Sequence, residues 1–155
     1  MVAEVLNDPS LFEVLFNGVL SDDPLVRMRC ADALEKITLE HPEYLQPFKA
    51  RFLQEIAQSK QREVRWHLAQ MLPRLGLSAE ERAVAVEVLG DYLNDKSKIV
   101  KTFSMQALAD LVEQEASLRE RVIPILEELS ETGSSAMKSR GRKLLRKLRP
   151  SASTA

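Results

Sequence analysis

The side chains that could carry out catalysis are few and lie far apart in this chain. Its 155 residues include one cysteine, Cys30, and two histidines, His41 and His67. Nucleophilic catalysis needs a nucleophile beside a base that a third group orients, but Cys30 falls at an apolar helix position, which indicates a small buried side chain. His41 precedes Pro42 in a predicted loop, and no second histidine follows His67 at the i+4 spacing of a helical metal site. We therefore expect no catalytic residues, no metal and no cofactor.

Basic side chains gather at the C-terminal end, where they could bind an anion. No acidic residue follows Glu131, and seven Lys or Arg lie between residues 134 and 155, whereas residues 1–133 hold 15 Lys and Arg against 23 Asp and Glu, a balance of −8. Such a cluster is typical of contact with nucleic-acid phosphates or an acidic protein, and also of a solubilising face on the last helix of a stack. The candidate residues for an anionic partner are Lys138, Arg142, Lys143, Arg146, Lys147 and Arg149.

A repeated pair of residues indicates which elements position these side chains. An apolar residue followed by a basic one begins a similar pattern at Val26-Arg27, Val64-Arg65, Val100-Lys101 and Met137-Lys138, in steps of 38, 36 and 37 residues. A fixed period of this length, with one apolar stripe per unit, is typical of stacked helical hairpins. The low content of glycine (five residues) and of aromatic side chains (eight) also favours helices over strands.

Each unit is predicted to contain two helices joined by a short turn. The predicted first helices cover residues 10–20, 43–58, 79–93 and 118–130, and the second helices cover residues 24–39, 62–75, 98–113 and 135–148. Ser78, followed three residues later by Glu81, forms a capping box at one helix start. The apolar stripes of the second helices predict a seam between neighbouring units, with Val26, Val64 and Val100 in equivalent positions.

These features resemble the HEAT-repeat family. The family pattern has a first helix that is often interrupted by proline, an Asp-containing turn, and then Val-Arg with spaced Ala and Leu. Residues 123–126 (Ile-Pro-Ile-Leu) and 46–48 (Gln-Pro-Phe) are similar to its first helices, and residues 22–27 and 95–101 are similar to its turn. Residues 59–61 lack an aspartate, and Lys138 stands where the pattern has arginine, so we expect no regular Asp–Arg ladder between units.

The resemblance implies an all-α fold, a right-handed α-α superhelix (solenoid) of about four helical hairpins with eight helices. It covers residues 10–149 as a single repeat domain, with residues 1–9 as an N-terminal segment that could cap it and residues 150–155 as a disordered tail. It also implies that the second helices line the concave side. A four-helix bundle or an irregular helical domain is the alternative fold.

A concave row on the second helices is the predicted protein-binding surface. At 100° per residue, the positions farthest from the apolar stripe carry mostly charged and amide side chains. Phe103 stands out there as an aromatic residue, and exposed aromatics beside arginine are common binding anchors, whereas Trp66 either belongs to this row or packs at the seam. The candidate residues are Arg29, Lys36, Trp66, His67, Arg74, Phe103, Gln106 and Arg140.

The first helix is apolar around about two-thirds of its circumference, which is unusual for a helix at the end of a stack. Its apolar side chains are Leu11, Phe12, Val14, Leu15, Phe16, Val19 and Leu20. Either Val2, Val5 and Leu6 fold back over it, or it contacts another protein or a second copy of the chain in a homodimer.

The sequence thus predicts a non-catalytic scaffold that binds a protein partner. A nucleic-acid-binding module using the basic last helix is the alternative, and an accessory subunit of an enzyme, as in the HEAT-like bilin lyases, is a third hypothesis. One cysteine allows no intramolecular disulfide, and no apolar stretch approaches the ~20 residues of a membrane span. Because the first residues also lack a basic and apolar leader, we expect a cytoplasmic protein.

Overall fold

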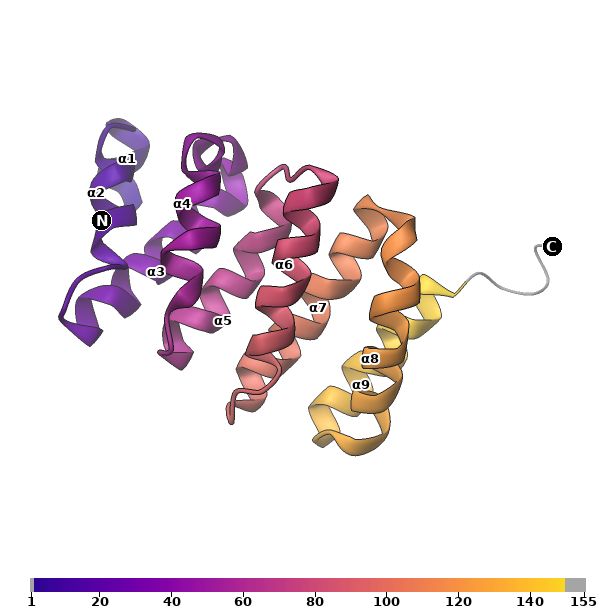
Figure 1. Ribbon diagram of the computed structural model, residues 1–155. Coiled ribbons are helices and arrows are strands. Elements are labelled where there is room, and N and C mark those ends of the chain that lie inside the picture. Colours follow the sequence, from indigo (N-terminus) through magenta and orange to yellow (C-terminus); the bar gives the residue numbers. More distant parts are fainter. Residues whose placement is uncertain (1, 150–155) are drawn as a thin grey trace.

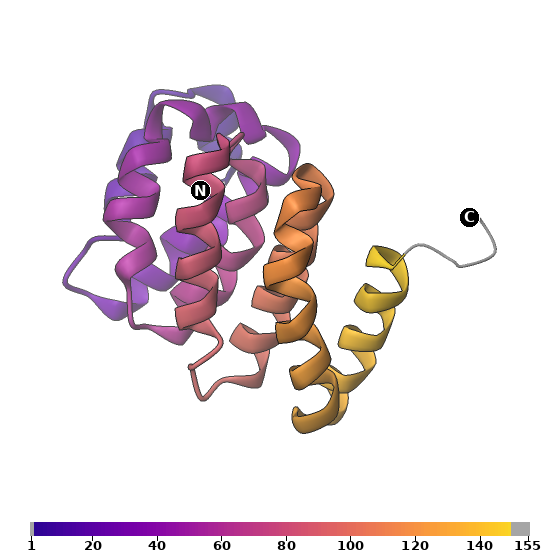
Figure 2. The ribbon, with the colours of Figure 1, turned by 45° about the vertical axis from the view of Figure 1, so that its right-hand side comes forward.

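The structure is a computed structural model that describes residues 2–149, and Figures 1 and 2 show its helices. Over these residues the regular structure is entirely helical, with nine α-helices, four short 3₁₀ segments and no strand, so the all-α prediction is confirmed. The expected count of eight helices is wrong within the same range, because part of the N-terminal segment forms a helix of its own. The predicted tail at 150–155 lies outside the described residues.

The repeat predicts where the second helix of each unit begins. The α-helices of the described range are α1 Val2–Asn7, α2 Leu11–Gly18, α3 Pro24–Glu40, α4 Lys49–Gln54, α5 Arg62–Met71, α6 Ala79–Tyr92, α7 Lys98–Gln114, α8 Arg119–Thr132 and α9 Ser135–Leu148. The 3₁₀ segments there are η1 Pro42–Phe48, η2 Ile56–Gln58, η3 Leu72–Arg74 and η4 Ala116–Leu118. The second helices α3, α5, α7 and α9 each begin at the predicted residue.

The helices lie in two layers (Figure 1). α2, α4, α6 and α8 form one layer, and α3, α5, α7 and α9 form the other. Within the second layer α3 packs on α5, α5 on α7, and α7 on α9. Side chains of one unit therefore meet those of the next unit, and α1 and α9 lie at opposite ends of the stack.

The apolar stripes of the second helices meet inside the stack. Val64 and Val100 are 0% exposed and Met137 is 3% exposed, as the repeat predicts. The equivalent Val26 is 39% exposed, so the seam prediction is wrong at this position. The reason is that α3 begins the second layer, and no preceding second helix covers this side chain.

The turn before each second helix ends in a polar residue. The side chains of Asp23, Ser97 and Ser134 accept hydrogen bonds from backbone N–H groups in the first turns of α3, α7 and α9. These bonds satisfy donors that a helix leaves unpaired at its start. Gln61 occupies the same position before α5 and makes no such bond, because its side chain contacts the preceding unit instead.

The predicted continuous helix over residues 43–58 is wrong, since this segment divides into η1, α4 and η2. Pro47 lies inside it, and proline removes a backbone donor and disfavours the α conformation at the residue before it. The α-helix therefore begins only at Lys49. In contrast, the capping box predicted at Ser78 and Glu81 is present at the start of α6, and that helix continues without interruption.

Glycine allows two of the helix pairs to pack closely. Gly141 on α9 is buried, and a Cβ at this position would collide with Oγ of Ser130 on α8. Gly18 on α2 has the same role, since a Cβ there would collide with Sγ of Cys30 on α3. In each pair a small side chain faces a glycine, and Cys30 is the buried small residue that its sequence position predicts.

Candidate functional site

The predicted protein-binding residues lie on the second layer. Seven belong to α3, α5, α7 and α9, and Arg74 lies in η3 directly after α5. Arg29 and Lys36 are exposed, whereas the other six are partly buried. Contacts with neighbouring helices account for the burial of several of them. We refer to these eight residues as the second-helix row.

Contacts between units bury part of the second-helix row in a repeating register. Nη1 of Arg140 on α9 donates a hydrogen bond of 3.0 Å to Oε1 of Gln106 on α7. Nε2 of His67 on α5 lies 3.8 Å from Oδ1 of Asp32 on α3. Arg140 and His67 each lie two residues after the basic residue of their own repeated pair. Gln106 and Asp32 each lie five residues after the basic residue of the repeated pair in the preceding unit. The same two register positions therefore face each other at the junction of α3 with α5 and at that of α7 with α9.

Arg74 joins the first two units. Its Nη1 donates hydrogen bonds to the Glu35 backbone oxygen at 2.8 Å, to Glu35 Oε2 at 3.1 Å and to Thr38 Oγ1 at 3.1 Å. The side chains of Arg74 and Glu35 are only 18% and 16% exposed. Charge-assisted bonds are stronger than neutral ones, so Arg74 holds the second unit against α3 and offers little of its charge to a partner.

Trp66 and His67 form a fixed pair in the middle of the row. The indole Nε1 of Trp66 donates to His67 Nε2 at 3.1 Å, which assigns the proton of the neutral imidazole to Nδ1. That Nδ1 is buried and has no hydrogen-bond partner among the described residues. Burial lowers the pKa of His67, and the carboxylate of Asp32 opposes this shift. Trp66 also packs against the core, as the seam interpretation predicts.

Phe103 holds the register position on α7 that His67 holds on α5 and Arg140 holds on α9. Its ring packs against the core and remains partly exposed. Two exposed basic residues of the same layer, Arg29 and Lys143, lie on its first and last helices. The accessible part of the layer thus combines a partly exposed aromatic ring with basic side chains at either end.

The basic residue of the repeated pair has a role that sequence reasoning missed. Arg65 is 6% exposed. It donates hydrogen bonds to the Ser59 backbone oxygen at 2.8 Å, to Asp95 Oδ2 at 3.1 Å and to Asp91 Oδ2 at 3.2 Å. Its guanidinium also lies over the ring of Tyr92, 4.8 Å from the centroid. Arg65 thus joins α5 to α6 and to the turn before α7.

Arg27 makes the equivalent contact one unit earlier. Its Nε donates to Gln61 Oε1 at 2.9 Å and its Nη1 donates to the Ser21 backbone oxygen at 2.8 Å. Gln61 Nε2 in turn donates to the Pro24 backbone oxygen at 3.0 Å. Gln61 therefore takes the place of the aspartate that residues 59–61 lack. The polar residues that recur in the turn before each second helix were the sequence signal for this contact.

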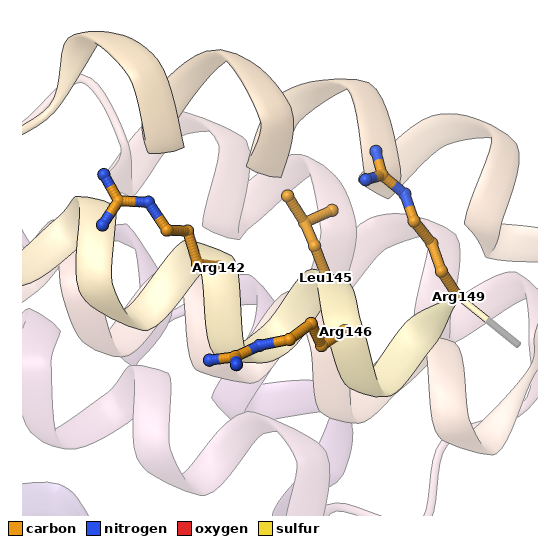
Figure 3. A pocket seen from close by; sticks show the side chains of 4 residues that line it. All are labelled: Arg142, Leu145, Arg146 and Arg149. Atoms are coloured by element: carbon orange, nitrogen blue, oxygen red, sulfur yellow. The ribbon is translucent and has the colours of Figure 1, made fainter. Parts of the chain in front are cut away.

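The predicted anionic-partner residues lie on α9 and at its C-terminal cap. An open hollow of about 670 Å³ (Figure 3) is lined by Arg142, Leu145, Arg146 and Arg149. Arg142 and Arg146 are equivalent in the repeat to Met105 and Ala109 of α7, which are 0% and 2% exposed. α9 thus carries charge where an inner helix carries buried side chains, which suits the outermost helix of the described stack.

Some of these basic side chains already have partners. Lys147 Nζ lies 3.0 Å from Glu113 Oε1, and Arg149 Nη2 lies 2.6 Å from Glu127 Oε2. Within residues 2–149 no salt bridge is formed by the remaining four, which are Lys138, Arg142, Lys143 and Arg146.

The other groups considered for chemistry do not come together. Cys30 is buried, and burial raises the pKa of its thiol. Nδ1 of His41 lies 2.9 Å from Oε1 of Glu43, and the His41 ring stacks on Tyr44. Among the residues that the structure describes, no three His, Cys, Asp or Glu side chains are grouped so as to hold a metal ion. In the same part of the chain no helix has the length and apolar character to cross a membrane.

Comparison with known proteins yields no relative. No family model matches the chain, and neither a curated protein nor a solved structure matches it. The inference of function therefore depends on the surfaces described above.

Proposed function

We propose that the helix pairs are HEAT-like repeats forming a short right-handed superhelix, and that the protein is a non-catalytic scaffold that binds another protein. The binding surface is the second-helix row. One observation supports this assignment above the others: hydrogen bonds such as Arg74 to Glu35 and Arg140 to Gln106 join successive units along the row. A surface held in this way loses little conformational freedom when a partner binds.

Phe103 is the proposed centre of the contact. Its partly exposed ring offers an apolar anchor, and aromatic and arginine side chains dominate the binding energy of many interfaces. Arg29 and Lys36 supply exposed positive charge on the first helix of the row. His67, Arg74 and Arg140 keep the surface rigid, because each already contacts the preceding unit.

Quantitative affinity capture from native lysate tests this proposal with a matched pair of variants. Phe103→Ala removes the proposed anchor, and Val84→Ala trims a side chain that is 44% exposed on α6, in the other layer. We expect Phe103→Ala to reduce recovery of a stoichiometric partner at least tenfold, while Val84→Ala leaves it unchanged. Far-UV circular dichroism checks that both variants are folded. Equal recovery with wild type and Phe103→Ala would reject the row as the binding surface.

A nucleic-acid-binding function remains a second proposal, and the hollow at α9 favours it. Arg142 and Arg146 line this hollow without a salt bridge inside the described range. Binding to duplex phosphates should weaken with salt, with a log–log slope near −0.9 for each phosphate contact. Arg142→Glu/Arg146→Glu should flatten this slope. If DNA and RNA cause no mobility change even at low salt, this function is excluded.

A further inference from the structure

The end of the stack at α2 and α3 leaves apolar side chains uncovered. Val14 on α2 is 65% exposed, and Leu25 and Val26 in the first turn of α3 are 47% and 39% exposed. In the interior of the stack, the equivalents of Val26 on α5 and α7 are 0% exposed, because the preceding second helix covers them. We call the surface around Val14 and Val26 the N-terminal end face.

A groove of about 630 Å³ runs along this end face, at the indigo end of Figure 1. Residues of α1, α2 and α3 line it, namely Glu4, Val5, Leu11, Val14, Leu15, Gly18, Val26 and Cys30. α1 covers part of the face, since Val5 is 2% exposed, but Leu6 on the same helix is 39% exposed. α1 thus packs against α2 and α3, and an apolar groove remains open beside it.

The interior of the stack shows which positions of a preceding unit meet such a face. His67 on α5 lies 3.8 Å from Asp32 of α3, and Arg74 in η3 binds Glu35 of the same helix. Arg140 on α9 binds the side-chain amide of Gln106 on α7. Arg29 occupies on α3 the position that His67 occupies on α5. Arg29 is exposed and forms no salt bridge within residues 2–149. Since no described carboxylate pairs with Arg29, an acidic side chain on the occupant, at the position that Asp32 holds on α3, is the complementary neighbour for this charge.

The α9 end of a second copy of the chain would not place an acidic side chain beside Arg29. The residues of α9 equivalent to Asp32 and Glu35 are Lys143 and Arg146. If a second copy continued the row, Lys143 would lie beside Arg29 and Arg146 beside Lys36. Like charges at such positions repel and disfavour the wrong partner. Head-to-tail stacking of copies is thus opposed, and the charge pattern favours a different protein.

We propose that the N-terminal end face binds an amphipathic helix of another protein, one that carries an acidic residue beside its apolar stripe. The apolar stripe fills the groove over Val14 and Val26, and the acidic residue contacts Arg29. This inference goes beyond the scaffold function, because the groove of the end face and the surface around Phe103 are different surfaces, although Arg29 lies beside the first and also belongs to the second-helix row. Binding at one does not require binding at the other.

Two helical probes that differ in one charge test the proposal. The acidic probe is a synthetic peptide with the sequence of residues 24–40, with Cys30→Ala and a side-chain cross-link that holds it helical. It carries Asp32 beside its apolar stripe, as α3 does toward α5. The basic probe has Asp32→Lys in addition. Titration into ¹⁵N-labelled protein, followed at the amides of Val14, Gly18 and Val26, gives the dissociation constant for each probe.

We expect the acidic probe to bind with saturable shifts at these amides and the basic probe to bind at least about fivefold more weakly. In the Arg29→Glu protein the order should reverse. Val14→Asp should prevent binding of both probes, whereas Val84→Asp, the same change at another exposed valine, should not. Equal affinity for the two probes, or the absence of saturable shifts at the end face, would overturn the proposal.

Sedimentation equilibrium of the protein alone tests whether a second copy of the chain occupies the end face. A dimer that dissociates in the Val14→Asp variant would assign the face to a second copy and would also overturn the proposal. A monomer at all concentrations is the expected result. Failure of this inference leaves the Phe103 test of the scaffold function unaffected, because that test changes no residue of the end face.

Discussion

Arg65→Met should lower the free energy of unfolding by about 3–5 kcal/mol. The side chains of Arg65 and Asp95 are 8% and 12% exposed, and a charge-assisted hydrogen bond in such a setting contributes about 1.5–3 kcal/mol. The bond to the Ser59 carbonyl adds about 1 kcal/mol, and the contact with the Tyr92 ring adds about 0.5–1 kcal/mol. Asp91 is 58% exposed, so its ion pair contributes little.

Urea denaturation followed by circular dichroism measures this loss, and a thermal melt should show a decrease in Tm of roughly 10 °C. Methionine preserves most of the apolar volume of the arginine stem, so the measured change reports the polar contacts. Arg62→Met is the matched control, since Arg62 lies on the same helix with a side chain that is 66% exposed, and it should change stability by less than about 0.5 kcal/mol. A loss below about 1 kcal/mol for Arg65→Met, or one equal to that of Arg62→Met, would refute the role of Arg65 in joining the units.

Three further predictions concern the interior and the helix starts. Gly141→Ala should lower the free energy of unfolding by about 2–3 kcal/mol, because its Cβ would collide with Oγ of Ser130. Gly90→Ala is the control: its Cβ would meet nothing within 4 Å, so it should stabilise α6 by about 0.5–1 kcal/mol. Similar shifts in Tm for the two variants would contradict this packing. Ser78→Ala should lower the free energy of unfolding by about 1 kcal/mol, because it removes the capping box of α6, and an unchanged urea midpoint would argue against that. Burial lowers the pKa of His67 below its usual 6.5, so this residue favours the folded state fully above about pH 6.5 and loses that contribution as pH falls through its folded pKa. His67→Gln should therefore lose less stability than wild type between about pH 7 and pH 5, and an equal loss would disprove the link.

The second helices could be predicted from sequence because their signals are local. Each begins after a polar turn and carries an apolar stripe, and the structure places all four starts at the predicted residues. The first helix of the second unit could not be predicted in the same way. Its apolar pattern continues through Pro47, but the backbone there forms a 3₁₀ segment up to Phe48, so periodicity alone overestimated the length of the helix.

The exposure of the second-helix row was harder to predict, because the exposure of a side chain in a stack also depends on the neighbouring helices. A helical wheel places His67, Arg74 and Arg140 on the side away from the apolar stripe, yet each contacts the preceding unit. The partners lie 34 to 39 residues earlier in the chain. Only a comparison of one unit with the next could have identified such pairs. For His67 and Arg140 the available signal was their place two residues after the basic residue of the repeated pair, with the contacted residue five residues after the basic residue of the preceding unit.

The two ends of the stack differ in a way that bears on where a partner binds. At α9, the outermost described helix at this end, the residues equivalent to Met105 and Ala109 are Arg142 and Arg146, so the sequence departs there from the interior pattern. At α3 there is no such departure, because Val26 keeps the apolar identity of an interior position although it is 39% exposed. A charged replacement makes an open end compatible with water, whereas an interior residue left without its neighbour retains an apolar surface that another helix can cover. The N-terminal end face, where the sequence keeps the interior pattern, is therefore the end at which we expect a helix of a second protein to bind.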